Sequence, residues 1–182
     1  MKKLTLTIIA FLGLFVGAMA QTATHGVDIT INSVAMIRAV NGMGGTALNS
    51  GFIVGPLTNA GAMPRTNEAN DNVLYLQYTS IKTATGTPRT IKAVLSGTIP
   101  TGLSIYATAA TPTGTGDVGL TLGSQAISTI AATLINNIGS GYTGTATNNG
   151  ANIFYSSTIT TMASLKATTS TPLTVTYTLS SE

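Results

Sequence analysis

The stretch that decides the fold lies near the C-terminus, where residues 172–180 are Pro-Leu-Thr-Val-Thr-Tyr-Thr-Leu-Ser. Its apolar residues Leu173, Val175, Tyr177 and Leu179 alternate with threonines. An apolar–polar period of two is typical of a strand that buries one face and exposes the other. Threonine also favours the extended backbone. The stretch therefore predicts a terminal β-strand with a threonine face toward water.

The same pattern recurs along the 182 residues of the chain. Candidate strands lie at residues 27–31, 34–40, 52–54, 73–79, 89–96, 103–108, 133–138, 153–160 and 173–179. The segments between them are rich in Gly, Pro and Asn, the residues that form turns. Seven to nine short strands without a secure long helix predict an all-β protein. We expect a single domain at 21–182, folded as an antiparallel immunoglobulin-like β-sandwich.

Two features of these strands predict how they pair. Residues 73–79 are apolar or aromatic on both faces, which is typical of a central strand that is covered on both sides. Residues 89–96 and 103–108 flank the turn signal at residues 100–102, so we expect them to be neighbouring antiparallel strands.

Three segments lack a clear strand pattern. Residues 57–72 and 111–119 are polar or glycine-rich and predict loops, the second being the most flexible segment of the chain. Between residues 125 and 138 the apolar positions fit a helical stripe, although β-branched residues dominate. We favour a short strand at 133–138, and the helical alternative stays open.

The first twenty residues are typical of a secretory signal peptide. Lys2 and Lys3 precede an apolar run, and the small residues Ala18 and Ala20 fit the cleavage rule. The run is shorter than the roughly 20 apolar residues that span a bilayer. We therefore expect cleavage after residue 20, a secreted or cell-surface protein and no transmembrane anchor afterwards.

Charge is scarce, since Asp, Glu, Lys and Arg make up 7% of the chain. Two of the eight basic residues belong to the predicted signal peptide, so the remaining chain has a net charge of about +1 without a basic cluster. Nucleic-acid binding depends on several neighbouring cations that neutralise phosphates. Nucleic acid is therefore not an expected partner.

Few residues could carry catalysis or bind a metal. The chain has no Cys and one histidine, His25, which excludes thiolate sites and a two-histidine metal site within one chain. Glu68 and Asp71 are the only close carboxylates, and with Asn70 and Asn72 they could supply oxygen ligands to Ca²⁺. The segment lacks the ligand spacing of a calcium loop, so we expect no enzyme, no metal and no cofactor.

Tyrosines could form a platform for sugars, because aromatic side chains have an apolar body and a polar tip. The candidates on predicted strands or near them are Tyr78, Tyr106, Tyr142 and Tyr155. With the loops at 57–72 and 109–119, they define an alternative function, a monomeric secreted module that binds a carbohydrate or surface glycan.

Both ends of the domain carry alternating strands with few charges. Terminal strands often lie at sheet edges, where main-chain N–H and C=O groups can pair with another chain. The N-terminal stretch contributes Val27, Ile29 and Ile31, with Asp28 as its only charge. The C-terminal stretch contributes Leu173, Val175, Tyr177 and Leu179. We expect these seven residues to form the strand-edge assembly sites, unless the two end strands pair within one chain.

The chain resembles secreted pilin-type sandwiches, which include fimbrial subunits and spore-coat-U-like proteins. The resemblance rests on the signal peptide, residues 27–31, the Gly/Thr-rich stretch 138–145 and residues 173–179. It implies that a terminal strand completes a neighbouring subunit by donor-strand addition. The disulfide common in these subunits is absent, and Tyr177 lies further from the C-terminus than the penultimate tyrosine of chaperone–usher pilins.

These observations together predict a non-enzymatic extracellular subunit that is structural or adhesive. We expect it to form a homo-oligomer or a homopolymer through its strand edges, as a filament or a surface layer.

Overall fold

The computed structural model describes residues 26–41, 53–54, 59–64, 66–67, 74–168 and 172–180. The chain divides into two compact units, Met1–Ile31 and Asn32–Glu182. The predicted signal peptide at residues 1–20 lies outside the described residues, as do His25 and the candidate calcium ligands between Glu68 and Asn72.

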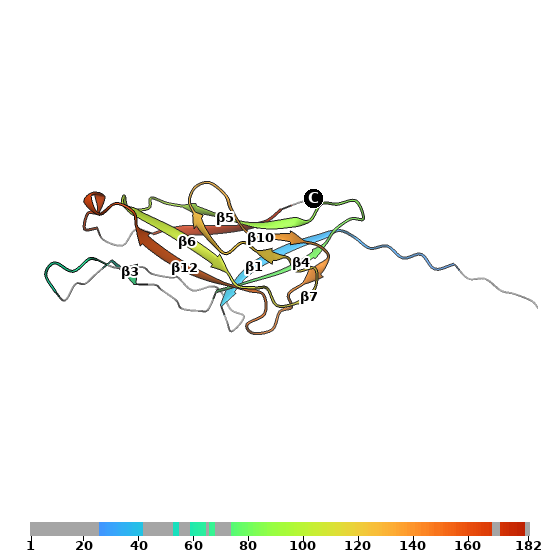
Figure 1. Cartoon of the computed structure of the whole chain (residues 1–182). Helices are drawn as coiled ribbons and strands as arrows, with labels where there is room; N and C mark the ends of the chain where they lie inside the picture. The colour runs from blue at the N-terminus through green and yellow to red at the C-terminus, as the bar shows by residue number, and fades with distance from the viewer. Residues whose placement is uncertain are drawn as a thin grey trace, which may run out of the picture. The chain divides into compact units, whose positions relative to one another are not determined.

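The described part of the second unit is built from β-strands (Figure 1). The strands are β1 (Val34–Asn41), β2 (Ile53–Val54), β3 (Thr66–Asn67), β4 (Leu74–Ile81), β5 (Arg89–Ser96), β6 (Leu103–Ala109), β7 (Thr115–Gly116), β8 (Leu120–Thr121), β9 (Ser124–Ile127), β10 (Ala132–Ile138), β11 (Gly141–Tyr142), β12 (Ala151–Ile159) and β13 (Thr174–Leu179). Between β12 and β13 lies one short 3₁₀ turn, η1 (Met162–Ser164).

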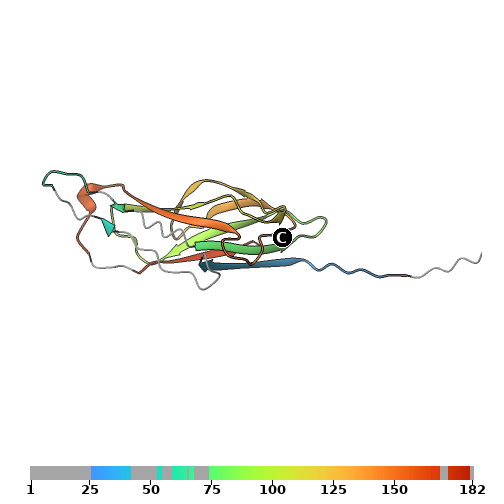
Figure 2. The ribbon, with the colours of Figure 1, turned by 90° about the horizontal axis from the view of Figure 1, so that it is seen from below.

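The longer strands form two antiparallel sheets. The larger sheet has the order β7-β11-β4-β12-β6-β9, and the smaller one has the order β13-β5-β10-β8. β1 pairs with β4 along its whole length (Figure 2), whereas β11 and β12 share the opposite edge of β4. β2 and β3 pair separately. β1 and β13 are thus edge strands of different sheets among the described strands.

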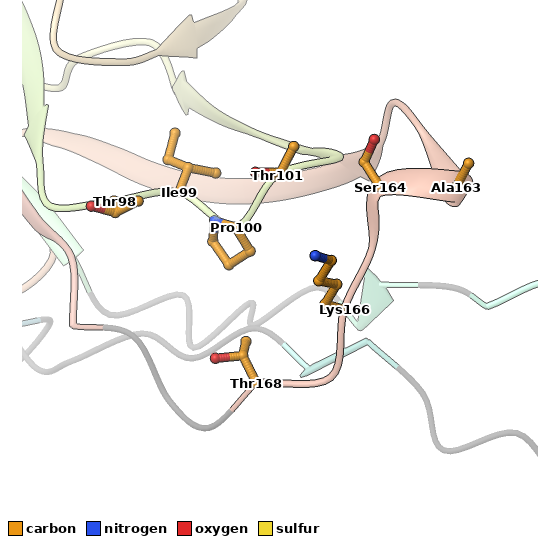
Figure 3. Close-up of a pocket in the computed structure, with 8 residues that line it drawn as sticks. All are labelled: Thr98, Ile99, Pro100, Thr101, Ala163, Ser164, Lys166 and Thr168. Carbon is orange, nitrogen blue, oxygen red and sulfur yellow. The ribbon is translucent and has the colours of Figure 1, made fainter.

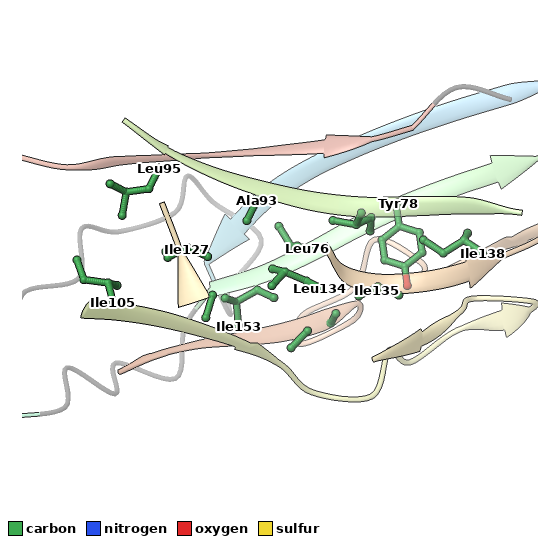
Figure 4. Close-up of a cluster of buried hydrophobic side chains, with 14 residues drawn as sticks. Leu76, Tyr78, Ala93, Leu95, Ile105, Ile127, Leu134, Ile135, Ile138 and Ile153 are labelled. Atoms are coloured by element: carbon green, nitrogen blue, oxygen red, sulfur yellow. The ribbon is translucent and has the colours of Figure 1, made fainter. Parts of the chain in front are cut away.

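Both sheets contribute one face to a common hydrophobic core (Figure 4). Leu76 and Ile153 come from the larger sheet, and Ile91 and Leu134 come from the smaller one. Along β5 the buried residues alternate with partly or fully exposed ones, as the period of two requires. The result is a sandwich-like all-β fold, in which burial of these side chains is the main stabilising contribution.

Most of the predicted strands are confirmed. The strands β1, β4, β5, β6, β10, β12 and β13 match the predicted ranges within two residues at each end. The strand at 132–138 settles the ambiguous segment, where no helix forms. β4 is a central strand, as the apolar residues on both of its faces predict.

Three sequence-based expectations are corrected. β5 and β6 belong to different sheets, because the two edges of β5 already pair with β10 and β13. The predicted loops at 57–72 and 111–119 contain the short strands β3 and β7. The alternating residues 27–31 lie in no strand, since the first described strand begins at Val34.

A buried glutamine holds the turn between β11 and β12 on the outer face of β4. The Nε2 group of Gln77 donates hydrogen bonds to the carbonyl oxygens of Ala146 (3.1 Å) and Asn149 (3.2 Å). Its Oε1 accepts from Nε (3.0 Å) and Nη2 (2.6 Å) of Arg38 on β1. One side chain therefore connects an edge strand, the central strand and a turn.

We expect Gln77→Leu to lower the free energy of unfolding by about 2 kcal/mol, because the leucine leaves two carbonyl acceptors and a guanidinium without this partner. Urea unfolding followed by circular dichroism measures the loss. Thr79→Val is the matched control, since Thr79 lies on the same face of β4 and is half-buried. Equal losses in the two variants would contradict a specific role for the amide.

Candidate functional site

The described end of the first unit exposes three large apolar side chains. Val27, Ile29 and Ile31 have exposed fractions of 72%, 80% and 76%. All residues from 26 to 33 are exposed, so these three apolar side chains are accessible to another chain. Since Asp28 is the only charge in this stretch, little opposes its pairing with another strand.

β13 is one of the two edge strands of the smaller sheet, and β8 is the other. Among the described strands it pairs only with β5, in a continuous register from Thr174↔Ser96 to Leu179↔Ile91. Its six residues carry no charge, so the devices that usually discourage edge pairing are absent from this strand. The outer edge of β13 is therefore suited to main-chain pairing with a further strand.

The inward face of β13 is only partly covered. Leu173, Val175, Tyr177 and Leu179 pack against the core, as the alternation predicts, but each stays half-buried. The core-facing residues of the neighbouring strand β5, such as Ile91, are fully buried. The edge of the sandwich at β13 therefore leaves apolar surface that another strand could cover.

A tyrosine pair connects β13 to the opposite sheet. The hydroxyl groups of Tyr155 on β12 and Tyr177 on β13 form a hydrogen bond. Burial raises the pKa of Tyr177, and the neighbouring Tyr155 raises it further. Burial also raises the pKa of Tyr155, against a smaller lowering by its hydrogen bond with Tyr177. Both hydroxyls therefore stay protonated at neutral pH.

A buried arginine anchors both edge strands at the same end. Arg89, with an exposed fraction of 4%, donates from Nη1 to the Ser180 carbonyl oxygen (3.2 Å) and from Nη2 to Ser33 Oγ (2.9 Å). Ser33 precedes β1 and Ser180 follows β13, and the two strands contact each other. The sequence analysis did not identify this role, although Arg89 lies on the same face of β5 as the core residues Ile91, Ala93 and Leu95.

The described residues bring no acidic cluster together. Asp117 is exposed in the loop after β7, and its side chain lies against Gly139. Across the described ranges, no group of three or more His, Cys, Asp or Glu residues could hold a metal ion. The same ranges contain no helix with the length and apolarity needed to cross a membrane.

The four candidate tyrosines do not form one sugar platform. Tyr78 is buried, and its hydroxyl donates to the Val118 carbonyl oxygen (2.5 Å). Tyr155 faces the core, where its hydroxyl meets that of Tyr177. Tyr106 is half-buried, and Tyr142 has an exposed fraction of 52%. Burial on the inner face removes two of the four from any surface site.

The fold and its edges define the chain as an all-β protein with two antiparallel sheets and a shared core. Comparison with known proteins adds no relative, since no family model, curated protein or solved structure matches the chain.

Proposed function

We propose that this chain is a non-enzymatic extracellular subunit, structural or adhesive, that assembles with copies of itself through strand edges. In this proposal the domain is an immunoglobulin-like sandwich, and a signal peptide at residues 1–20 directs its export. The observation that carries the proposal is the exposed apolar set Val27, Ile29 and Ile31.

The proposed donor is the stretch 27–31 of one copy. Its alternation places the three apolar side chains on one face of an extended strand. In water these side chains are mostly exposed, and their burial against a partner is worth roughly 1.5–3 kcal/mol for each fully buried side chain. Main-chain hydrogen bonds along the strand add register and specificity. Pairing with a second copy therefore lowers the free energy of a stretch whose apolar side chains are otherwise exposed to water.

The proposed acceptor is the margin formed by β1 and β13 of a second copy. Both strands lie at sheet edges among the described strands, and they contact each other. The half-buried row that includes Val175 and Leu179 provides apolar surface for the donor side chains. Arg89 holds the ends of both strands, so the margin is formed before a donor binds.

The test is the triple variant Val27→Asp, Ile29→Asp and Ile31→Asp. We expect wild-type protein to form filaments or layers in negative-stain microscopy, and we expect the triple variant to remain monomeric in size-exclusion chromatography. The physical reason is that three carboxylates cannot be buried against an apolar acceptor without a large desolvation cost.

The matched control places three acids on the other face of the same stretch, as Gly26→Asp, Thr30→Asp and Asn32→Asp. This control should still assemble, because the apolar face is intact. If the triple variant forms polymers that are indistinguishable from those of the wild type, the proposal is wrong. Monodisperse wild-type particles would favour the alternative function, a monomeric module that binds glycans.

A further inference from the structure

Two loops at one end of the sheets line an open hollow of about 580 Å³. One loop, residues 98–101, leads into β6, and the other includes part of η1 and continues to Thr168. Figure 3 shows the side chain of Lys166 directed from the second loop toward Ile99 and Pro100 of the first. A hollow of this volume falls within the range of small-molecule sites.

Main-chain contacts fix the two loops against each other. The carbonyl oxygen of Gly102 accepts hydrogen bonds from the N–H groups of Thr160 (2.8 Å) and Thr161 (3.3 Å). Gly102 has a positive φ of 93°, and a Cβ at this position would lie only 2.5 Å from the carbonyl oxygen of Thr161. The close approach therefore requires glycine, and it holds the end of the first loop against the start of the second.

The lining combines three kinds of chemistry. Ile99 and Pro100 provide an apolar surface, and Ile99 also packs against the core. Hydroxyl groups come from four residues, Thr98, Thr101, Ser164 and Thr168. Lys166 supplies the one formal charge of the described lining, an ammonium group with three donors.

We propose that this hollow binds an acidic saccharide unit, a sugar ring that carries a carboxylate or a sulfate. The ring would lie on Ile99 and Pro100, its hydroxyls would meet those of Thr98, Thr101 and Ser164, and its anionic group would pair with Lys166. The site uses neither the tyrosines nor the loops 57–72 and 109–119 that the sequence suggested for glycans. It is also independent of the proposed strand-edge assembly.

The test is isothermal titration calorimetry of the full-length purified protein with three oligosaccharides of equal length: an oligogalacturonate, a sulfated galactan oligomer and a neutral galactan oligomer. We expect an acidic oligomer to bind at least about tenfold more tightly than the neutral one, because a charge-assisted hydrogen bond is worth more than tenfold in affinity. Affinity should fall as salt rises, since the charge lies near solvent. Binding of only one acidic oligomer identifies the anionic group.

Lys166→Gln should weaken the acidic oligomer about tenfold and leave the neutral one unchanged. Lys82→Gln is the control, because Lys82 lies in the turn after β4, where its Nζ donates to the Gly86 carbonyl oxygen (3.2 Å). Equal losses in both variants, or equal binding of acidic and neutral oligomers, would overturn the proposal. If neither acidic oligomer binds, the proposal is overturned as well. This result would not bear on assembly, which microscopy tests separately.

Discussion

A Gly150→Ala variant is expected to lose about 3 kcal/mol of folding free energy. Gly150 precedes β12 with a φ of +106°, and a Cβ there would overlap the carbonyl oxygen of Leu76 and lie 2.9 Å from its carbonyl carbon. The positive φ costs a residue with a side chain roughly 1–2 kcal/mol. The overlap with the main chain of β4 adds roughly 1–3 kcal/mol, because backbone cannot move aside as a flexible side chain can.

Urea unfolding of the purified protein measures this loss, and Gly123→Ala separates its two causes. Gly123 also has a positive φ, +73°, but an added Cβ would meet nothing within 4 Å. We expect Gly123→Ala to cost about 1 kcal/mol, from the backbone conformation alone. If the two variants lose the same amount, the overlap with Leu76 has no energetic consequence.

Glycine also explains why the segment at 111–119 was predicted to be the most flexible loop. Gly114 and Gly116 approach the carbonyl oxygens of Tyr142 and Ser140 so closely that a Cβ on either would overlap them. β7 forms within this segment and pairs with β11. In a sequence, a glycine that permits motion and a glycine that permits close packing look the same.

The strands were predictable from sequence because their burial follows the period of two, as β13 and β5 illustrate. Their partners were not predictable. The apparent hairpin of β5 and β6 fails because β10 and β13 occupy both edges of β5. Local patterns specify which face of a strand is buried, whereas pairing depends on strands that are distant in sequence.

The same distinction applies to the candidate sites. Leu173, Val175, Tyr177 and Leu179 face the core from an edge strand, as their alternation predicts. The roles of Arg89 and Gln77 could not be predicted, because their hydrogen-bond partners are distant in sequence. The hollow at Lys166 could not be predicted, because loops without periodicity form it.

The sandwich is expected to lose stability in alkali as the pH rises above about pH 10. Burial raises the pKa of Tyr78, Tyr155 and Tyr177, so the folded protein keeps these three protons above pH 10. The unfolded chain releases them near pH 10. Their contribution to stability is therefore complete below about pH 10 and is lost as the pH rises further. Tyr78 and Tyr177, whose pKa values are raised most, each add a slope of about 1.4 kcal/mol per pH unit and together approach roughly 3 kcal/mol per unit, and Tyr155 acts in the same direction.

Urea unfolding at half-unit intervals from pH 8 to pH 11 measures this slope, and two phenylalanine variants assign it. Tyr177→Phe should reduce the slope above pH 10 by up to about half, because one of the two groups with the largest rise in pKa is removed. It should also cost about 1 kcal/mol at neutral pH, since Tyr155 loses this partner. Tyr142→Phe is the matched control, because that side chain has an exposed fraction of 52%. Wild-type stability that stays constant up to pH 11 would contradict this prediction. It would show that the tyrosine hydroxyls ionise without unfolding the sandwich. It would also show that water reaches the Tyr155–Tyr177 pair at the edge formed by β13.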